Sequence, residues 1–430
     1  MAQGAFYDIY TTEIKTVYPD IALEPVLNQE QKFRPKLSKS LPPGAKKGKG
    51  SIVFPAYLAT PENVGQISDQ SDLPPSKNRT SALFTLRPTT FVGKMEIGWQ
   101  TNETANDSEA AFAGGEIKRQ TEETLADTGK FIEQTYVGTA SDGIRGYVES
   151  DGSNLFVVKL PHGVKLLRPN HYISVRIAAG STVRDSFDGY TITSTDPDTR
   201  TVYYGSTDRT LVANDPVYIV SQTTMTLTNV FANGVRGLID DGTNGQYIHG
   251  LDRTTTANIN LRSIVYDAGT LVNLPESILL TTAITVQDRT NKTPEVIMCA
   301  QGQAVKYAEF VAPQRRFPQE GAALNGGFKP TQGMDYDDLI FVAPGIKMKF
   351  IVSQDVLFRE LYLLNMSTFF HYLAKPMAWN DKMMMIPTPS ANGGFIAGFT
   401  SVMYSVENLG NFYPRGNAVI RNLRDPFAGD

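Results

Sequence analysis

The sequence predicts an α+β protein built from two or three domains. Its 430 residues exceed the usual size of one compact core. Short β-branched and aromatic runs between Gly, Asp, Asn and Pro turns fill long stretches of the chain and predict strands. A single long run of helix-forming residues begins near residue 106. Separate strand-rich regions combined with one long helix are typical of an α+β fold.

Residues 1–45 are expected to form an extended arm. Their prolines, at positions 19, 25, 35, 42 and 43, lack a backbone N–H and disfavour long helices and central strands. Residues 46–105 open with KKGKG and hold two strand-like runs, SIVFPAYL and FTLRPTTFVGKMEIGWQ, around the polar stretch SDQSDLPPSKNRT. This order predicts a long two-stranded loop.

A long helix is expected over about residues 106–137. Asn106 can cap its start, with Glu109 three residues later. One face carries apolar residues and threonines three or four positions apart, while Arg119 and Glu123 lie on the solvated side. That face is thin and the helix contains glycines, so it suits the surface of a sheet better than the centre of a helical bundle. The residues of this face are Ile117, Thr121, Leu125, Thr128, Ile132 and Thr135.

The remaining chain alternates between strand-rich and mixed regions. Residues 140–222 contain NLFVVKL, YISVRIA, YTITSTD, RTVYYGS and PVYIVSQ, which predict a small barrel or sandwich of five or six strands. Next come a helix starting at Pro275 in PESILLTTAITV, the strand EVIMCA and the helix QAVKYAEFV. The last hundred residues predict strands at IKMKFIVSQDV, LYLLNM, FIAGFTSVMYSVE and NAVIRNL, and one helix near STFFHYLAK.

Composition limits the possible functions. The net charge is −4, so no overall positive field attracts nucleic acid or acidic lipid. Cys299 is the only cysteine, which excludes an intramolecular disulfide and a multi-cysteine zinc cluster, and its apolar neighbours indicate an inert buried thiol. The sequence holds no apolar run of about 20 residues, and its first residues lack the order of a signal peptide. We therefore expect neither a membrane span nor secretion.

Motifs that suggest a binding site have simpler explanations. The run GAKKGKGS at 44–51 has the wrong spacing for a phosphate-binding loop and precedes a strand pattern, so we interpret it as a cationic hinge. The carboxylate-rich runs DPDT, DDGTNG and DYDD are explained by turn chemistry. The histidines show no metal-ligand spacing; they are His162, His171, His249 and His371. The sequence therefore predicts no catalytic residue, cofactor or metal site, and a protein that is not an enzyme.

The order of these regions resembles the Hong Kong 97-like (HK97-like) major capsid proteins of tailed phages. The resemblance covers nearly the whole chain and rests on segment order, since that family has no sharp sequence signature. It assigns residues 1–45 to an N-terminal arm, 46–105 to the E-loop, 106–139 to the spine helix of the peripheral domain and 140–222 to an inserted, small β-barrel-like domain. Residues 223–335 would be mainly axial domain, and 336–430 mainly peripheral-domain sheet and C-terminal strands.

The resemblance implies a major capsid protein that self-assembles as hexamers and pentamers into the icosahedral head of a tailed phage. The double-stranded DNA genome would be enclosed by proximity, without sequence-specific binding or contact with a membrane. Some family members begin with a helical scaffolding segment, and the proline-rich arm is too short for one. A separate scaffolding protein, a portal and a decoration protein are therefore the expected partners. Assembly would take place in the host cytoplasm, and the protein would reside in the virion capsid.

An extended arm and a long polar loop bury little within their own subunit, so neighbouring subunits are expected to supply the missing contacts. We assign no inter-subunit cross-link, because abundant lysines and asparagines do not identify one.

A tail-tube or fibre subunit remains an alternative, although it would not need the long helix. An enzyme with a β-rich appendage would need a pocket of perturbed titratable groups. The candidate inter-subunit contacts are Lys49, Lys77, Arg79, Glu116, Arg119 and Glu123.

Overall fold

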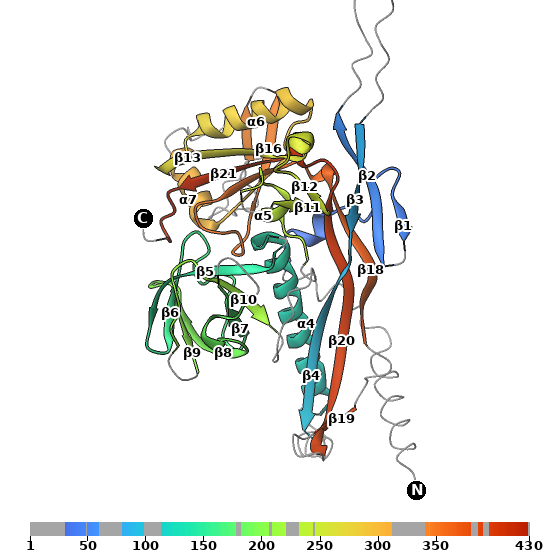
Figure 1. Ribbon diagram of the computed structural model, residues 1–430, viewed down its shortest axis with the longest axis vertical. Helices are drawn as coiled ribbons and strands as arrows, with labels where there is room; N and C mark the ends of the chain where they lie inside the picture. Colours follow the sequence, from blue (N-terminus) through green and yellow to red (C-terminus); the bar gives the residue numbers. More distant parts are fainter. Residues whose placement is uncertain are drawn as a thin grey trace, which may run out of the picture. The chain divides into compact units, whose positions relative to one another are not determined.

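The described residues form two compact units (Figure 1). Unit 1 contains the described residues of Met1–Lys39, Arg87–Glu133 and His371–Asn408, and unit 2 those of Ser40–Leu86, Gln134–Phe370 and Leu409–Asp430. Each unit thus combines segments that are far apart in the sequence. The computed structural model describes residues 31–48, 50–59, 80–98, 113–140, 142–177, 182–205, 209–220, 232–243, 246–311, 340–343, 345–379, 386–389 and 395–428.

Unit 1 is a β-sheet with a long helix, α4 (Ala113–Gly138), that runs alongside strands β4 and β20 (Figure 1). The central strand β20 pairs antiparallel with β4 over ten residues, and it also pairs with β18 and β19. Such a long strand is possible because β-branched and aromatic residues recur along FIAGFTSVMYSVE. The strands are β4 (Thr89–Gly98), β18 (Phe369–Trp379), β19 (Ile386–Pro389) and β20 (Phe395–Asn411).

Helix α4 approaches strand β4 closely at Gly93. A Cβ atom at this position would lie 2.8 Å from Oγ1 of Thr128, so any larger residue would push the helix away from the sheet. Leu125 and Ile132 are fully buried on the same side of the helix, whereas Glu123 is exposed. The expected buried face, and its packing on a sheet, are confirmed for the described side chains. The predicted start of the helix, including its cap, lies outside the described residues.

Two sequence expectations for this region are corrected by the structure. The run FTLRPTTFVGKMEIGWQ is not one strand of a two-stranded loop, because its first part pairs with β2 and its second part pairs with β20. The break falls at Pro88, which has no N–H for a ladder hydrogen bond.

Near STFFHYLAK, a 3-10 turn (η6, Met366–Thr368) leads into strand β18 in place of a helix. Aromatic residues and Pro376 favour the strand over the helix here.

A small antiparallel sheet in unit 2 has the strand order β1-β2-β3. Phe54 and Phe84 pair across β2 and β3 and are both buried, whereas the neighbouring Leu83 is 65% exposed. One face of this sheet is therefore packed and the other is open to solvent. Residues 60–79, between β2 and β3, lie outside the described part of the chain. The strands are β1 (Lys46–Gly48), β2 (Ser51–Ala59) and β3 (Thr80–Leu86).

A closed barrel with the strand order β10-β5-β6-β9-β8-β7 follows α4 in the sequence. The structure thus decides between the barrel and the sandwich that the sequence left open. Alternate residues of the strands point inward and form an apolar core, in which the ring centroids of Phe187 and Tyr204 are 4.8 Å apart. The strands are β5 (Ile144–Gly152), β6 (Leu155–Val158), β7 (Tyr172–Val175), β8 (Tyr190–Asp196), β9 (Thr201–Tyr204) and β10 (Pro216–Val220).

The largest sheet has the strand order β13-β21-β17-β14-β16-β15. Helices α6 (Glu276–Thr290) and α7 (Gln301–Val311) lie where the sequence predicted them and share one apolar core with this sheet. In that core the ring of Tyr307 stacks on Phe350, with 4.8 Å between centroids. The strands are β13 (Ile264–Val272), β14 (Val296–Cys299), β15 (Ile340–Ala343), β16 (Ile346–Val352), β17 (Leu361–Leu364) and β21 (Ala418–Leu423).

This sheet combines strands from both sides of the expected division at residue 335, and the assignment of its strands to a peripheral or an axial domain stays a prediction. The strands β15, β16, β17 and β21 were expected mainly in a peripheral-domain sheet, yet they share one sheet with β13 and β14. The strand β14 is apolar and largely buried, so its backbone N–H and C=O groups need partner strands on both edges. It finds β16 on one side, in parallel, and β17 on the other, antiparallel.

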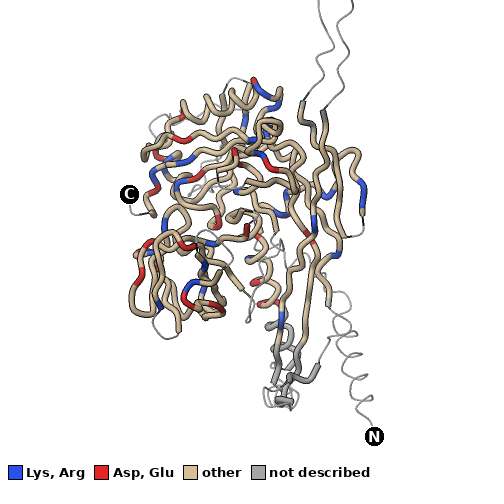
Figure 2. The backbone as a smooth tube through the Cα atoms, in the orientation of Figure 1, with Lys and Arg blue, Asp and Glu red and all other residues tan. Residues whose placement is uncertain are grey.

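The remaining elements are short. Positive and negative side chains are interspersed along the described backbone (Figure 2). No described helix is both long enough and apolar enough to cross a membrane. The short elements are η1 (Arg34–Lys36), η2 (Arg184–Ser186), α5 (Val235–Leu238), β11 (Tyr247–Ile248), β12 (Leu251–Asp252), η3 (Thr256–Leu261) and η7 (Pro414–Gly416).

Candidate functional site

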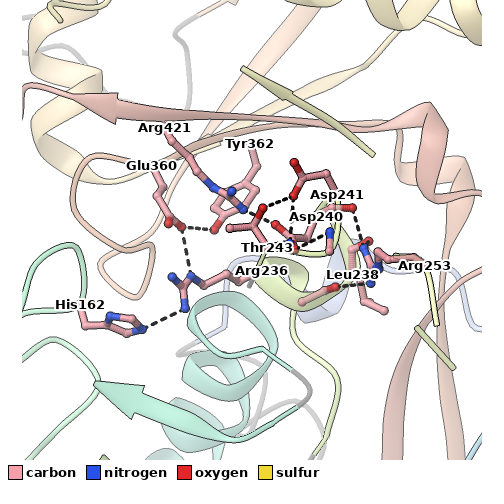
Figure 3. Close-up of polar contacts among 12 residues, drawn as sticks. His162, Arg236, Leu238, Asp240, Asp241, Thr243, Arg253, Glu360, Tyr362 and Arg421 are labelled. Carbon is pink, nitrogen blue, oxygen red and sulfur yellow. Dashed lines mark hydrogen bonds and ion pairs between the residues drawn. The ribbon is translucent and has the colours of Figure 1, made fainter. Parts of the chain in front are cut away.

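A cluster of charged side chains is buried on the face of the six-stranded sheet opposite α6 and α7 (Figure 3). Leu361 and Ile420 pair across β17 and β21 and belong to the apolar core. Side chains alternate along a strand, so the next residues, Tyr362 and Arg421, point to the other face. The sheet therefore has one apolar face and one face that carries buried charge.

Arg236, in the short helix α5, joins the barrel to the sheet. Its Nη1 donates to Nε2 of His162, 3.0 Å away, and its Nε lies 3.5 Å from Oε2 of Glu360. The hydroxyl of Tyr362 also donates to Glu360. Each of these side chains is buried, so their charges and dipoles face one another instead of water. The contact with Arg236 requires His162 to be neutral.

Asp240 and Arg253 complete the cluster. Arg421 donates to Oδ1 of Asp240. Arg253 is completely buried and donates to the carbonyl oxygens of Gly237, at 2.6 Å, and of Asp240, at 2.7 Å. Gly237 lies in the last turn of α5, so its carbonyl has no partner within the helix and is satisfied by Arg253. Burial lowers the pKa of Arg253 to about 10, so its guanidinium remains charged near neutral pH.

This arrangement is suited to binding segments together. Burial raises the pKa of Tyr362 well above its usual value and lowers that of His162 well below, so neither group exchanges protons readily near neutral pH. In the part of the chain that the structure describes, no group of three His, Cys, Asp or Glu residues is placed to hold a metal ion. Removal of one partner from a buried ion pair typically costs about 3–5 kcal/mol. The cluster therefore braces the barrel against the sheet.

The loop from Pro161 to Lys165 makes a second contact between the barrel and the sheet. The backbone N–H of Phe358 donates to the carbonyl of Pro161 at 2.9 Å. Nζ of Lys165 donates to the carbonyl of Val356 at 2.8 Å and lies 3.9 Å from the ring centroid of Phe358. Burial lowers the pKa of Lys165 to about 8. Gly163 has a φ of +55°, and a Cβ atom there would lie 2.9 Å from Phe358, so only glycine fits.

Aromatic rings fix the base of the β2–β3 hairpin. The ring centroid of Phe54 lies 5.2 Å from Phe84, 5.5 Å from His249 and 5.3 Å from Phe370. His249 accepts a hydrogen bond at Nε2 from the backbone N–H of Asn411, 3.1 Å away. Burial lowers the pKa of His249 to about 3, so the ring is neutral near pH 7. The hairpin thus starts from a rigid base in unit 2.

In unit 1, residues 31–37, here termed the strap, are held by a carboxylate on α4. The two oxygens of Glu133 accept hydrogen bonds from three consecutive backbone amides. Charge-assisted hydrogen bonds of this kind are about twice as strong as neutral ones. The amides belong to Lys32, Phe33 and Arg34, at 3.1, 2.7 and 3.3 Å.

A second carboxylate binds the strap through a side chain. Nη2 and Nε of Arg34 donate to Oε2 of Glu407 on β20, at 2.7 and 3.2 Å. The same oxygen lies 2.8 Å from Nε2 of His371 on β18. Burial alone would raise the pKa of Glu407, but the hydrogen bond from His371 and the charge of Arg34 outweigh burial and lower it. Glu407 is therefore ionised near neutral pH, and it anchors the strap.

The sequence-based candidates for subunit contacts lie mostly where side chains are not described. Glu123 is exposed on α4. Glu116 and Arg119 belong to α4, but their side chains fall outside the described part. All of them therefore stay predictions. Outside the described residues altogether are the E-loop candidates Lys49, Lys77 and Arg79.

The buried charges of the strap were missed by the sequence analysis because their partners are far apart in the chain. Arg34 and Glu407 are separated by 373 positions. One signal was available along β20, where Met403, Ser405 and Glu407 occupy alternate, inward-facing positions. A charged residue at an inward position of a strand indicates a buried partner.

Searches among protein families and curated proteins find no match to this chain. Among solved structures, the chain is similar to a cyanophage A-1(L) capsid asymmetric unit, at 11% sequence identity and a TM-score of 0.51, over 90% of this chain and 91% of that chain. It is also similar to a structure of Mycobacterium phage Bobi, at 7% identity and a TM-score of 0.44, over 92% and 90%. A capsid of a native GTA particle matches at 6% identity and a TM-score of 0.44, over 92% and 91%.

The similarity to the cyanophage capsid concerns the fold. It extends over nine tenths of both chains, so it is not confined to one sheet or to the barrel. This chain has the fold of that phage capsid structure, in agreement with the capsid fold that the order of its segments predicted. The matches to phage Bobi and to the GTA particle have TM-scores below 0.5 and are not used to infer the fold.

Proposed function

We propose that this chain is the major capsid protein of a tailed phage. Copies self-assemble as hexamers and pentamers into the icosahedral head that encloses the double-stranded DNA genome. The observation that carries this proposal is the similarity to a phage capsid subunit over 90% of the chain. Within one subunit, the buried charge cluster braces the barrel against the six-stranded sheet.

The shape of the individual elements suits a shell subunit. A closed shell repeats several modest interfaces by symmetry, so each interface can be polar and small. The β2–β3 hairpin has a rigid aromatic base and an open face that includes Leu83, 65% exposed. Helix α4 presents Glu123 on its solvent side. Both elements offer surface that the core of one subunit does not use.

The segments take the following roles in this proposal. Residues 1–45 are the N-terminal arm, the β2–β3 hairpin belongs to the E-loop, and α4 is the spine helix. The unit 1 sheet, including β4, is the peripheral-domain sheet, and the six-stranded sheet belongs to the axial domain. The barrel is the inserted domain. The proposed subunit contacts remain Lys49, Lys77, Arg79, Glu116, Arg119 and Glu123.

The proposed partners follow from the same role. A separate scaffolding protein guides assembly in the host cytoplasm, and a portal and a decoration protein complete the head. The packaged DNA is enclosed without sequence-specific binding, in keeping with a net charge of −4. A tail-tube or fibre subunit was the alternative, and the fold similarity gives it no support.

Electron microscopy of the full-length recombinant protein tests this function, alone and co-expressed with the neighbouring genes. Closed shells, or rings of five or six subunits, are the expected result. Straight tubes of constant diameter under every condition would favour the tail alternative, and small monodisperse particles throughout would contradict assembly.

A matched pair of variants tests whether the hairpin takes part. Leu83→Asp places a charge on the open face of β3, where we expect it to reduce shell formation strongly. Val212→Asp places the same charge at another exposed position, 46% accessible on the barrel, and serves as the control. Equal shell yields from the two variants would count against a contact at the hairpin.

A further inference from the structure

One loop of the barrel, residues 161–168 between β6 and β7, makes the contacts with the sheet side described above and is here termed the docking loop. Its sequence, PHGVKLLR, contains basic residues and a histidine but no carboxylate. The loop and its partners on the sheet side form a joint. The polar pairs of this joint are His162 with Arg236, Lys165 with the carbonyl of Val356, and Arg168 with Asp355.

His162 is the residue of the docking loop that can gain a charge below neutral pH. Its side chain is 1% exposed, and its Nε2 lies 3.0 Å from Nη1 of Arg236. Tyr147 on β5 also packs against it, edge to face, with 5.5 Å between ring centroids. A neutral imidazole accepts the hydrogen bond from the guanidinium, whereas an imidazolium would place two cations at this distance, away from water. The closed joint therefore requires a neutral His162.

The carboxylate of the cluster does not contact His162. Glu360 and His162 contact different nitrogens of Arg236 (Figure 3). Burial and the charge of Arg236 lower the pKa of His162 well below 6.5. A histidine that returns to water regains its ordinary pKa of 6.5, so opening of the joint binds a proton below this pH. The stability that the neutral His162 gives the closed joint is thus complete above pH 6.5 and is lost as the pH falls.

Other titratable groups of the joint do not produce this response. Burial raises the pKa of Asp355, so its protonation favours the closed joint. Burial lowers the pKa of Lys165 to about 8, so this lysine is already protonated below pH 6.5. Burial, and then the charges of Arg145 and Arg168, lower the pKa of His171 to about 4. These three residues all belong to the barrel and stay together when the joint opens.

We propose that the joint between the barrel and the six-stranded sheet opens in mild acid, and that protonation of His162 opens it. The barrel keeps its fold during opening, because its strands close around their own apolar core. Since opening binds one proton at His162, each pH unit below 6.5 should raise the ratio of open to closed molecules by up to about tenfold. The inference goes beyond the proposed function, because it concerns a single subunit whether or not it assembles.

Single-molecule energy transfer within the full-length, unassembled protein tests the opening. Dyes are attached at Val212→Cys on the barrel and Ile284→Cys on α6, positions that are 46% and 41% exposed. The native Cys299 is fully buried, and burial raises its pKa to about 12, so it does not compete for the dyes. Between pH 7 and pH 5 we expect a second population with lower energy transfer, which grows with acid and disappears again at pH 7.

Two outcomes of this experiment would overturn the opening. One is a single, unchanged distance over the whole pH range while far-UV circular dichroism shows the native fold. The other is a second population that appears only together with loss of the circular dichroism signal, because it would report unfolding of the subunit and not movement of the barrel.

Matched histidine variants assign the proton. His162→Gln keeps an acceptor for Arg236 but cannot gain a charge, so the growth of the open population with acid should disappear. His249→Gln removes another buried histidine whose pKa is lowered, away from the joint, and should leave that growth unchanged. A packing defect in a variant would change the open population at every pH, so the slope against pH is the readout. The same slope in His162→Gln as in the unmodified protein would overturn the role of His162.

Discussion

The barrel and the strap are held in place by opposite physical means. The barrel closes six neighbouring strands around an apolar core drawn from residues 148–217. The strap is fixed by two buried carboxylates, Glu133 and Glu407, which lie about 100 and 373 positions away. Apolar burial is non-directional, whereas a buried charge is stable only with its partner in place. The comparison suggests that the barrel depends on packing within one stretch of chain, and the strap on exact long-range placement.

The largest expected effect lies in the barrel core. Phe156 is fully buried beside Phe187 and Tyr204. Phe156→Ala should lower the free energy of unfolding by about 3–5 kcal/mol, because it removes apolar contacts and leaves a cavity. Denaturant unfolding of the unassembled subunit measures this loss, with Tyr203→Ala on the outside of the barrel as a control. A loss below about 1 kcal/mol would show that the barrel does not depend on its core.

A smaller effect is expected at the strap. Glu133→Gln keeps a hydrogen-bond acceptor but removes the charge that the three strap amides face, so stability should fall by about 1–3 kcal/mol. Hydrogen exchange at the amides of residues 32–34 should accelerate by the corresponding factor. Glu123→Gln, at an exposed position of the same helix, is the control. Equal exchange rates in both variants would argue that the carboxylate does not hold the strap.

Acid should weaken the base of the hairpin before it affects apolar packing. The pKa of His249 falls from 6.5 to about 3 on folding, so its contribution is complete above pH 6.5 and is lost as the pH falls towards 3. At pH 5.5 the loss should be about 1 kcal/mol. Thermal unfolding from pH 7 to pH 5 would show it, and His249→Gln should flatten this part of the profile. An unchanged profile would mean that folding does not lower the pKa of His249.

The smallest effect is expected from charges on the outside of the barrel. Arg200 and Glu149 form an ion pair at 2.5 Å, with side chains 26% and 44% exposed. Solvent screens such a pair, so Glu149→Gln should change stability by less than about 1 kcal/mol, and less still at high salt. The same denaturant measurement applies. A loss comparable to that of Phe156→Ala would contradict the view that apolar packing, and not surface charge, stabilises the barrel.

The elements best predicted from sequence were those with strong local signals. Helix α6 starts directly after Pro275, and α7 follows the apolar strand β14, both as expected. The buried face of α4 followed from helical spacing, as Leu125 and Ile132 show. The helix expected near STFFHYLAK was wrong, because aromatic residues in this run suit a strand that pairs with β20.

Strand pairing and the candidate sites could not be derived in the same way. Nothing local in FTLRPTTFVGKMEIGWQ indicates that its second half pairs with a strand about three hundred residues later. The ion pairs of Arg34 with Glu407 and of Arg236 with Glu360 likewise join residues without any sequence relation. Their members look like ordinary solvated charges until the chain brings them together.

Helices and strands follow from periodicity, turn residues and caps, which act over a few neighbouring positions, and the sequence specified most of them. The composition of the chain likewise indicated a protein without strong nucleic-acid attraction. Sheet order, the closure of the barrel and the buried charges emerged only in the folded chain. They depend on which distant segments meet, and that choice is set by the total burial of apolar surface and the pairing of every buried charge.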